Sequence, residues 1–396
     1  MARPSLLTKR LVGVSLFLGA MSQAAFAFEA EDVASALKAQ LDRQQVELEW
    51  EAVRQEGSTV VLDGATAAST DAEIEGALPL GEIRLEDVSE TDTGYRVENL
   101  DIASLSHEAD DVKVSLSGLS ISGLVLTKDA AADPYGGALR YERFEVDHVE
   151  ARDEDDVLLG SIEDLRADMS ISGEDQAMEI EGHPARFTVN TASLSKGENP
   201  RKTIEELGYE ELTGSLEFSG RWRPSDGQVR LDRYALTLDD GGTLVLTGEI
   251  SGYTPTFIRS VSEMTENMKA SEGSSQGMAM LGMMQQISFH GLSVRFDDDS
   301  LSEKVVDLVA SKQGGKREDV IAQAGAIIPM QLSPFLGTEL ANEVAQAVTT
   351  FLKAPDNIEI SAQPSTPVPF AMLMGAAMGA PEMLAKQIGL TVKANQ

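Results

Sequence analysis

Apolar and polar residues alternate along the middle of the chain, over residues 46–252. Between Val112 and Leu116, apolar residues alternate with lysine and serine, which is the pattern of a strand with one buried face. The alternation changes parity at Gly118 and again at Gly123. Because β-bulges commonly carry glycine, the pattern favours one long bent strand with a bulge at each glycine over three short strands.

Short polar connections separate the strands predicted further along. Ser225-Asp226-Gly227 lies between a strand that ends near Trp222 and one that begins at Gln228, and Asp239-Asp240-Gly241-Gly242 follows the next strand. Such glycine-containing turns favour antiparallel hairpins. The sequence therefore predicts an antiparallel β domain over residues 46–252, a meander bent into a groove.

Helical patterns flank this β domain. Residues 28–45 carry apolar residues at helical spacing with acidic residues at the start and no proline or glycine, which predicts an N-terminal helix. Residues 253–396 form a mixed region of helices, strands and methionine-rich segments. The predicted fold class is β-rich α+β: a long bent antiparallel sheet with helices packed at its C-terminal end.

Within the mixed region, Ser300-Leu301-Ser302-Glu303 has the form of a capping box, with Ser300 as N-cap. The helix that follows should carry Leu301, Val305 and Leu308 on one face. Further helices are expected over residues 320–328 and from about Pro334, the latter with an apolar stripe that ends at Phe351. Strands are expected at residues 287–296, 358–362 and 390–394.

Residues 1–27 have the pattern of a secretory signal peptide. Basic residues precede an apolar run over residues 11–20, and Ala25-Phe26-Ala27 supplies the small residues of a cleavage site. We expect cleavage between Ala27 and Phe28, export to the periplasm, and no integral membrane span afterwards. An uncleaved anchor is the alternative, but the apolar run is shorter than the ~20 residues of a spanning helix.

Composition narrows the function classes. The formal net charge of −33 argues against a nucleic-acid partner, because phosphates require a basic surface. The absence of cysteine excludes disulfides, thiolate catalysis and cysteine-ligated metals. The histidines lie far apart in sequence, residues 297–308 fail the EF-hand pattern, and the common catalytic and nucleotide-binding motifs are missing. The sequence therefore predicts no catalytic residue, no metal ligand and no cofactor.

Methionine is concentrated in the C-terminal region. Thioethers can ligate copper, but methionine more often fills cores or lines adaptable apolar grooves. We therefore expect the first cluster, residues 278–284, to be mostly buried, as core or as the lining of a groove for an apolar ligand. The candidate lining residues are Met278, Met280, Met283, Met284, Met372 and Met374.

Part of the chain resembles a known family. The segment WEAVRQEGSTVVLDGATA from Trp50, the segment LPLGEIRLEDVSETDTGYRVENLDI from Leu78, and the segment LTGSLEFSGRWRPSDGQVRLDRYALTLDDGGTLVLTGEISG from Leu212 resemble the strand and turn rhythm of AsmA-like envelope proteins. The ending from Ala354 is similar to uncharacterised secreted proteins of α-proteobacteria. The first resemblance implies a curved β-groove associated with envelope lipids; the retained membrane anchor of that family is missing here.

Three functions follow as expectations. The first is a non-enzymatic periplasmic protein that binds an apolar or amphipathic envelope ligand, such as a lipid, in a β-groove. The second is a structural or interaction module with an ordinary core and an envelope protein as partner. The third is an enzyme whose site is assembled from scattered carboxylates.

Overall fold

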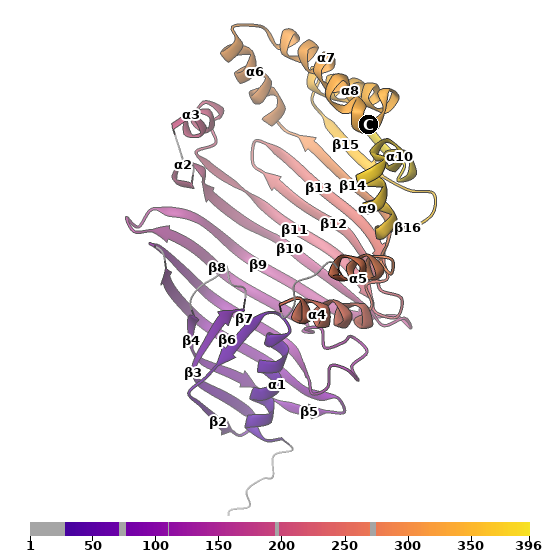
Figure 1. The fold of residues 1–396 in the computed structure, drawn as a ribbon. Helices are drawn as coiled ribbons and strands as arrows, with labels where there is room; N and C mark the ends of the chain where they lie inside the picture. Colours follow the sequence, from indigo (N-terminus) through magenta and orange to yellow (C-terminus); the bar gives the residue numbers. More distant parts are fainter. Residues whose placement is uncertain (1–27, 71–76, 110, 195–197, 270–274) are drawn as a thin grey trace, which may run out of the picture.

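The computed structural model describes residues 28–70, 77–109, 111–194, 198–269 and 275–396. In this part of the chain, seventeen strands belong to one antiparallel sheet, and helices lie along its edges and over its N-terminal part (Figure 1). The predicted fold class is thus confirmed. The expected signal peptide, with Ala27, lies outside the described residues, and Phe28 is the first residue within them.

The strands follow one another across the sheet in nearly their chain order. The first half contains β1 (Val46–Glu49), β2 (Ala52–Glu56), β3 (Thr59–Ser69), β4 (Ala77–Glu86), β5 (Ser89–Thr91), β6 (Gly94–Ala109), β7 (Val112–Thr127), β8 (Arg143–Asp153) and β9 (Leu158–Ser172). The second half contains β10 (Ala177–Asn190), β11 (Glu211–Arg223), β12 (Gln228–Leu238), β13 (Gly242–Ser251), β14 (Ser288–Asp298), β15 (Asn357–Ala362), β16 (Val368–Pro369) and β17 (Leu390–Ala394). From β6 to β15 each strand pairs with the next. β1 and β2 both pair with β3, and β17 pairs with β15.

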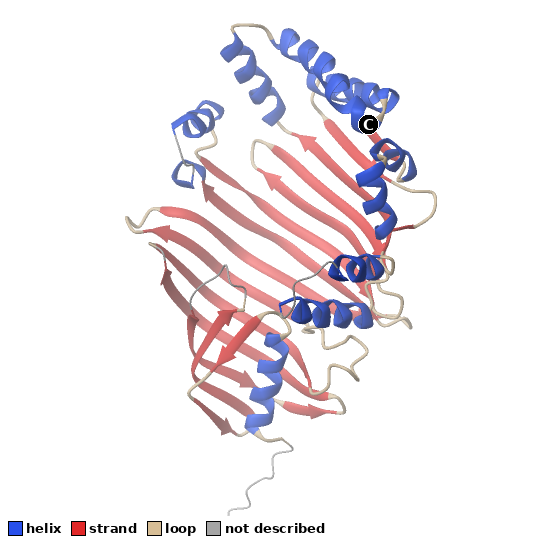
Figure 2. Ribbon diagram, in the orientation of Figure 1, coloured by secondary structure: helices blue, strands red, loops and turns tan. Residues whose placement is uncertain are grey.

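The helices occupy three places (Figure 2). One helix, α1 (Ala30–Asp42), lies over the N-terminal strands. Two short helices, α2 (Thr191–Leu194) and α3 (Glu198–Leu207), connect β10 to β11. The remaining helices belong to the C-terminal region: α4 (Pro255–Lys269), α5 (Ser275–Met284), α6 (Leu301–Gln313), α7 (Arg317–Leu336), α8 (Thr338–Lys353), α9 (Phe370–Gly379) and α10 (Pro381–Gln387).

The long strand β7 runs without interruption through Gly118 and Gly123, as the sequence predicts. Both glycines have φ near +65°, a left-handed conformation that favours glycine. The β6–β7 ladder lacks a paired residue at each glycine, yet its register is the same on both sides. Neither glycine inserts an extra residue, so the expected β-bulges are instead left-handed kinks that keep the register. The kinks return the apolar side chains to the same face each time the sequence parity changes.

The hydrophobic core lies under α1. Val33 and Leu37 of that helix pack with Leu62, Val97 and Leu124 of the strands, and all five side chains are buried. The helix ends at Asp42, earlier than the predicted residue 45, because the chain turns at Gln45 with a positive φ and enters β1. This packing covers the inner face of the N-terminal strands.

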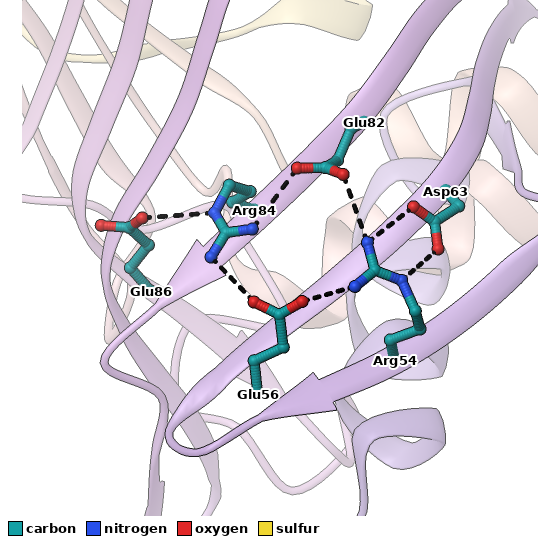
Figure 3. Close-up of polar contacts among 6 residues, drawn as sticks. All are labelled: Arg54, Glu56, Asp63, Glu82, Arg84 and Glu86. Atoms are coloured by element: carbon teal, nitrogen blue, oxygen red, sulfur yellow. Dashed lines mark hydrogen bonds and ion pairs between the residues drawn. The ribbon is translucent and has the colours of Figure 1, made fainter.

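The outer face of the same strands carries a network of ion pairs (Figure 3). The Arg54 guanidinium lies 2.5 Å from an Asp63 carboxylate oxygen and also contacts Glu56, and the Arg84 guanidinium lies 3.2 Å from a Glu56 carboxylate oxygen. In the strand register Val61 lies between the two arginines, and it is fully buried. The alkyl parts of both arginines therefore shield an apolar residue one strand in from the edge of the sheet while their charges remain in solvent.

The C-terminal helices differ from the sequence predictions in their details. The helix α6 buries Val306 and Ala310, whereas Val305, expected on the apolar face of the helix, is exposed. The residues expected to form two helices, 320–328 and the start of the next at Pro334, belong to the single helix α7, which contains Pro329 and Pro334. A proline inside a helix removes a backbone hydrogen bond and crowds the preceding turn, and the packing of α7 against α8 compensates for this cost. The Ser333 hydroxyl also donates a hydrogen bond to the Pro329 carbonyl at 2.5 Å.

The expected capping box at the start of α6 is also replaced. The Ser300 side chain makes no capping hydrogen bond and instead donates to the Asp240 carbonyl. The backbone N–H of Ser302 donates to an Asp298 carboxylate oxygen at 2.8 Å, and the Glu303 carboxylate lies 3.3 Å from the Arg317 guanidinium. Asp298 therefore does the capping expected of Ser300, because the hairpin at Asp240 captures the serine hydroxyl.

Candidate functional site: an open apolar face

A row of apolar residues crosses the sheet from β6 to β17. Residues paired across antiparallel strands point to the same face, so the register identifies the members of the row. In order they are Leu100, Ile121, Phe144, Ala167, Gly182, Phe218, Tyr234, Leu246, Val294, Ile360 and Val392. A second row with Met169, Ile180, Leu231 and Leu292 and a third with Leu216, Leu236, Leu244, Phe296 and Ile358 run beside it. We call these rows, from β9 to β15, the open apolar face.

The side chains of these rows become more exposed to solvent from the N-terminal strands toward the C-terminal strands. Leu100, near α1, is only 6% exposed. Tyr234 and Leu236 in β12 are exposed by more than a third, and Leu292 and Ile360 reach 44% and 49%. In the view of Figure 2, no helix crosses the middle of strands β9 to β12. A contiguous set of large apolar side chains left in contact with solvent is the usual mark of a binding surface.

Aromatic contacts border the open apolar face at one end of its strands. Trp222 of β11 makes edge contacts with Tyr135 and with Tyr253, both at ring-centroid distances of 6.4 Å. Tyr253 in turn contacts Phe257 of α4 at 5.9 Å, and Phe289 of β14 contacts Phe370 of α9 at 6.4 Å. The helices α4 and α9 are thereby attached at the border, and they leave the centre of the rows accessible.

The reverse face of the same strands is charged. Arg143 of β8 donates to an Asp168 carboxylate oxygen at 2.7 Å, and His183 of β10 lies 2.7 Å from the other oxygen. The Arg143 guanidinium, and to a smaller extent His183, lowers the pKa of the Asp168 carboxyl below its ordinary value. The sheet therefore has one face of paired charges and one apolar face.

Two hollows along these strands have volumes of about 350 and 540 Å³, and residues of both faces line them. Among the residues that line the larger hollow, the Arg230 guanidinium lies 2.6 Å from an Asp232 carboxylate oxygen, and a His290 ring nitrogen lies 3.6 Å from a Glu249 carboxylate oxygen. Within the described part of the chain, no group of three or more histidine, aspartate or glutamate residues could hold a metal ion. The smaller hollow is lined by four carboxylates, Asp168, Glu179, Glu181 and Asp232, and by one arginine, Arg221.

The candidate methionines lie beside the open apolar face. Met283 and Met284 of α5 are half-buried, and Met280 is 45% exposed, so the expected burial is wrong for Met280. Met372 and Met374 of α9 are exposed. The side chain of Met278 lies outside the described residues. Helices α5 and α9 contact each other, so the structure brings the two methionine segments together, at the C-terminal edge of the sheet.

Sequence reasoning did not single out the residues of the open apolar face. Tyr234, Leu236, Leu292 and Ile360 lie in strands that were predicted correctly, and their alternation indicates one apolar face. The alternation does not tell whether a second layer covers that face. Only the arrangement of the helices shows that the centre is left open.

Among the residues that the structure describes, no helix is both long and apolar enough to span a membrane.

The fold and its open face define a class of protein: a single-layer antiparallel sheet with one accessible apolar face. A family model described as "Uncharacterized protein" matches residues 235–395, from within β12 to the end of β17. No curated protein matches the chain. The matched region contains the C-terminal strands of the open apolar face and the methionine-bearing helices.

Proposed function

We propose that this chain is a non-enzymatic periplasmic protein that binds an apolar or amphipathic envelope molecule on its open apolar face. The observation that carries the proposal is the exposure of Tyr234, Leu236, Leu292 and Ile360 on one continuous surface. Covering such side chains with an acyl chain removes apolar area from water, which stabilises the complex by about 25 cal/mol per Å².

The proposal includes kinship with AsmA-like envelope proteins and an origin among the secreted proteins of α-proteobacteria. The segments that carry this resemblance form strands β2 to β6 and β11 to β13, and the last of these strands contribute to the open apolar face. A cleaved signal peptide would deliver the chain to the compartment where envelope lipids are exchanged. The charged reverse face would keep the loaded protein soluble.

Ligand binding is tested first without a chosen ligand. The protein, purified from the periplasm, is analysed by native mass spectrometry and then extracted with organic solvent. A co-purified lipid supports the proposal, whereas a stoichiometric protein partner without lipid favours an interaction module.

Variants then locate the binding surface. We expect Leu292→Gln and Ile360→Gln to weaken binding of the apolar dye N-phenyl-1-naphthylamine by at least about threefold each, because each places an amide on the open apolar face. The matched control is Val305→Gln, since Val305 is 39% exposed but lies on α6. Equal dye affinity of all three variants and the unmodified protein would contradict the proposed location.

A further inference from the structure

A second apolar surface lies on the C-terminal helices. We define the methionine belt as the helices α5, α9 and α10 together with the C-terminal half of α7. Its exposed large apolar residues are Met280, Leu281, Ile327, Met330, Phe335, Met372, Met374, Met378 and Met383. Contacts of α5 with α9, of α9 with α10 and of α10 with α7 make the belt continuous, and Figure 1 shows these helices along the C-terminal side of the sheet.

Most of the belt comes from segments without charge; within it, α10 carries Glu382 and Lys386, which form an ion pair at 3.1 Å. Residues 273–289, 320–338 and 360–381 contain no lysine, arginine, aspartate or glutamate, although these residues make up 24% of the chain. The Glu382 side chain, the first charge after the last of these segments, packs against Gly337 at the end of α7. Three charge-free segments, far apart in sequence, thus meet on one surface of a strongly acidic protein.

The exposed residues are not the uncovered edge of an ordinary core. Met378 is 89% exposed, Met330 71% and Met383 69%. A helix that is apolar on all sides, as α9 is, normally lies inside a protein or in lipid. The belt therefore lacks a partner that covers it.

We infer that the methionine belt inserts into the surface of a zwitterionic phospholipid bilayer. The side chains of α9 include no hydrogen-bond donor, whereas protein interfaces are rich in tyrosine, tryptophan and arginine and make regular hydrogen bonds. Hydrocarbon requires none of these groups. The helical backbone satisfies its own hydrogen bonds, which a lipid environment demands, and short apolar helices can lie in the interface without crossing it.

A second copy of the chain fits the belt less well. Each molecule carries a formal net charge of −33, so two molecules that approach each other are repelled, while a zwitterionic surface carries no net charge. The inference goes beyond ligand binding on the sheet and does not require it. Insertion of the belt would hold the neighbouring open apolar face close to a bilayer.

The test uses the absence of cysteine. Met378→Cys in the exported protein creates a single labelling site for an environment-sensitive nitrobenzoxadiazole dye, and Val157→Cys, between β8 and β9, creates the control site. With phosphatidylcholine vesicles, we expect a blue shift of emission from the label at position 378 and none from the label at position 157. A label at position 378 that stays in a water-like environment would overturn the inference.

A flotation assay with the same vesicles supplies a second measurement. We expect the unmodified protein to float, and the variant carrying Met378→Asp and Met383→Asp to bind at least about tenfold more weakly, because carboxylates resist transfer into lipid. Both positions are highly exposed, so the fold should tolerate the changes. Flotation of both proteins, or of neither, would contradict insertion of the belt.

Light scattering of the two proteins distinguishes self-association. A dimer that the two aspartates disrupt, without flotation of the unmodified protein, would assign the belt to a second copy and overturn the inference. Unchanged binding of the apolar dye by the double-aspartate variant would show that the belt and the open apolar face act separately. A failure of ligand binding on the sheet is thereby distinguishable from a failure of membrane insertion.

Discussion

Asp133 and Arg140 form a buried ion pair in the loop between β7 and β8. An Asp133 carboxylate oxygen lies 2.8 Å from the Arg140 guanidinium, and the two side chains are only 1% and 12% exposed. The other Asp133 oxygen accepts from the Gly137 backbone N–H at 2.9 Å, and the Gly137 carbonyl accepts from Gln40 of α1 at 2.7 Å. The pair therefore fixes a loop that joins the N-terminal core to the sheet.

The first prediction concerns this pair. We expect Asp133→Ala to lower the free energy of unfolding by about 3–5 kcal/mol, because it leaves the Arg140 charge buried without its partner. Urea unfolding followed by circular dichroism measures the change. The control is Asp155→Ala at the exposed β8–β9 turn, which should stay within about 0.5 kcal/mol of the unmodified protein. Equal stability of the two variants would show that the loop contributes little to the fold.

The second prediction concerns the left-handed kinks in β7. A Cβ atom at Gly118 would lie 2.0 Å from an Asp147 carboxylate oxygen, and the backbone there has a positive φ. We expect Gly118→Ala to destabilise the protein by about 1–3 kcal/mol in thermal or urea unfolding.

Two further alanine variants distinguish backbone strain from the steric clash of the added Cβ atom as the cause of this destabilisation. Gly57 also has a positive φ but nothing within 4 Å of its Cβ position, so Gly57→Ala reports backbone strain alone. Gly282 of α5 has open space and no positive φ, and Gly282→Ala should be neutral or stabilising by up to about 1 kcal/mol. A neutral Gly118→Ala would mean that β7 can straighten without loss of stability.

The sequence predicts the strands well because their information is local. The parity changes at Gly118 and Gly123 indicate where β7 bends, and the polar turn at residues 239–242 indicates a hairpin that the structure confirms. The details that depend on distant residues were not predictable. Val306, and not Val305, faces inward on α6 because the neighbouring elements decide which of two adjacent stripes is covered.

In the candidate site, too, the sequence predicts the local features but not those that depend on the packing of distant segments. The methionine segments are visible in the sequence, and the structure brings Met280 and Met372 onto adjoining helices. Their exposure is a property of packing, because nothing in the sequence of α5 or α9 tells whether another layer covers them. For the same reason alternation in β12 predicts an apolar face for Tyr234 and Leu236 without telling that it is open.

The third prediction concerns the start of α6. Asp298→Ala should destabilise the protein by about 1 kcal/mol, because it removes the acceptor for the Ser302 backbone N–H. Glu303→Gln should change stability by less than about 0.5 kcal/mol, since Glu303 makes only an exposed ion pair with Arg317. Thermal unfolding of both variants provides the comparison. A larger loss of stability for Glu303→Gln than for Asp298→Ala would contradict capping by Asp298 and favour the capping box expected from the sequence.

The fourth prediction concerns pH. The pKa of Asp168 is lowered by Arg143 and His183, so ionised Asp168 stabilises the folded chain above its unfolded pKa of about 3.9. That contribution is lost as the pH falls through the lowered folded value. Asp168→Asn should therefore cost at most about 1 kcal/mol at pH 7, because the pair is partly exposed to solvent.

Urea unfolding of the unmodified protein and of the Asp168→Asn variant over a series of pH values measures this difference. It should shrink toward zero once the pH lies below the folded pKa of Asp168, where the unmodified carboxyl is also neutral. Asp155→Asn, at the exposed turn, is the control and should show no comparable trend. A difference that persists unchanged into strong acid would assign the effect to packing around Asp168 and not to its charge.

The fifth prediction concerns the first methionine cluster. Replacement of Met278, Met280, Met283 and Met284 together by leucine should change the free energy of unfolding by less than about 1.5 kcal/mol per site, because leucine keeps volume and apolar character. Dye binding should be retained, since the open apolar face is unchanged. A competition titration with Cu(I) tests the alternative that the thioethers ligate copper. Tight Cu(I) binding by the unmodified protein, lost in the quadruple variant while its stability barely moves, would favour a copper site over an apolar surface.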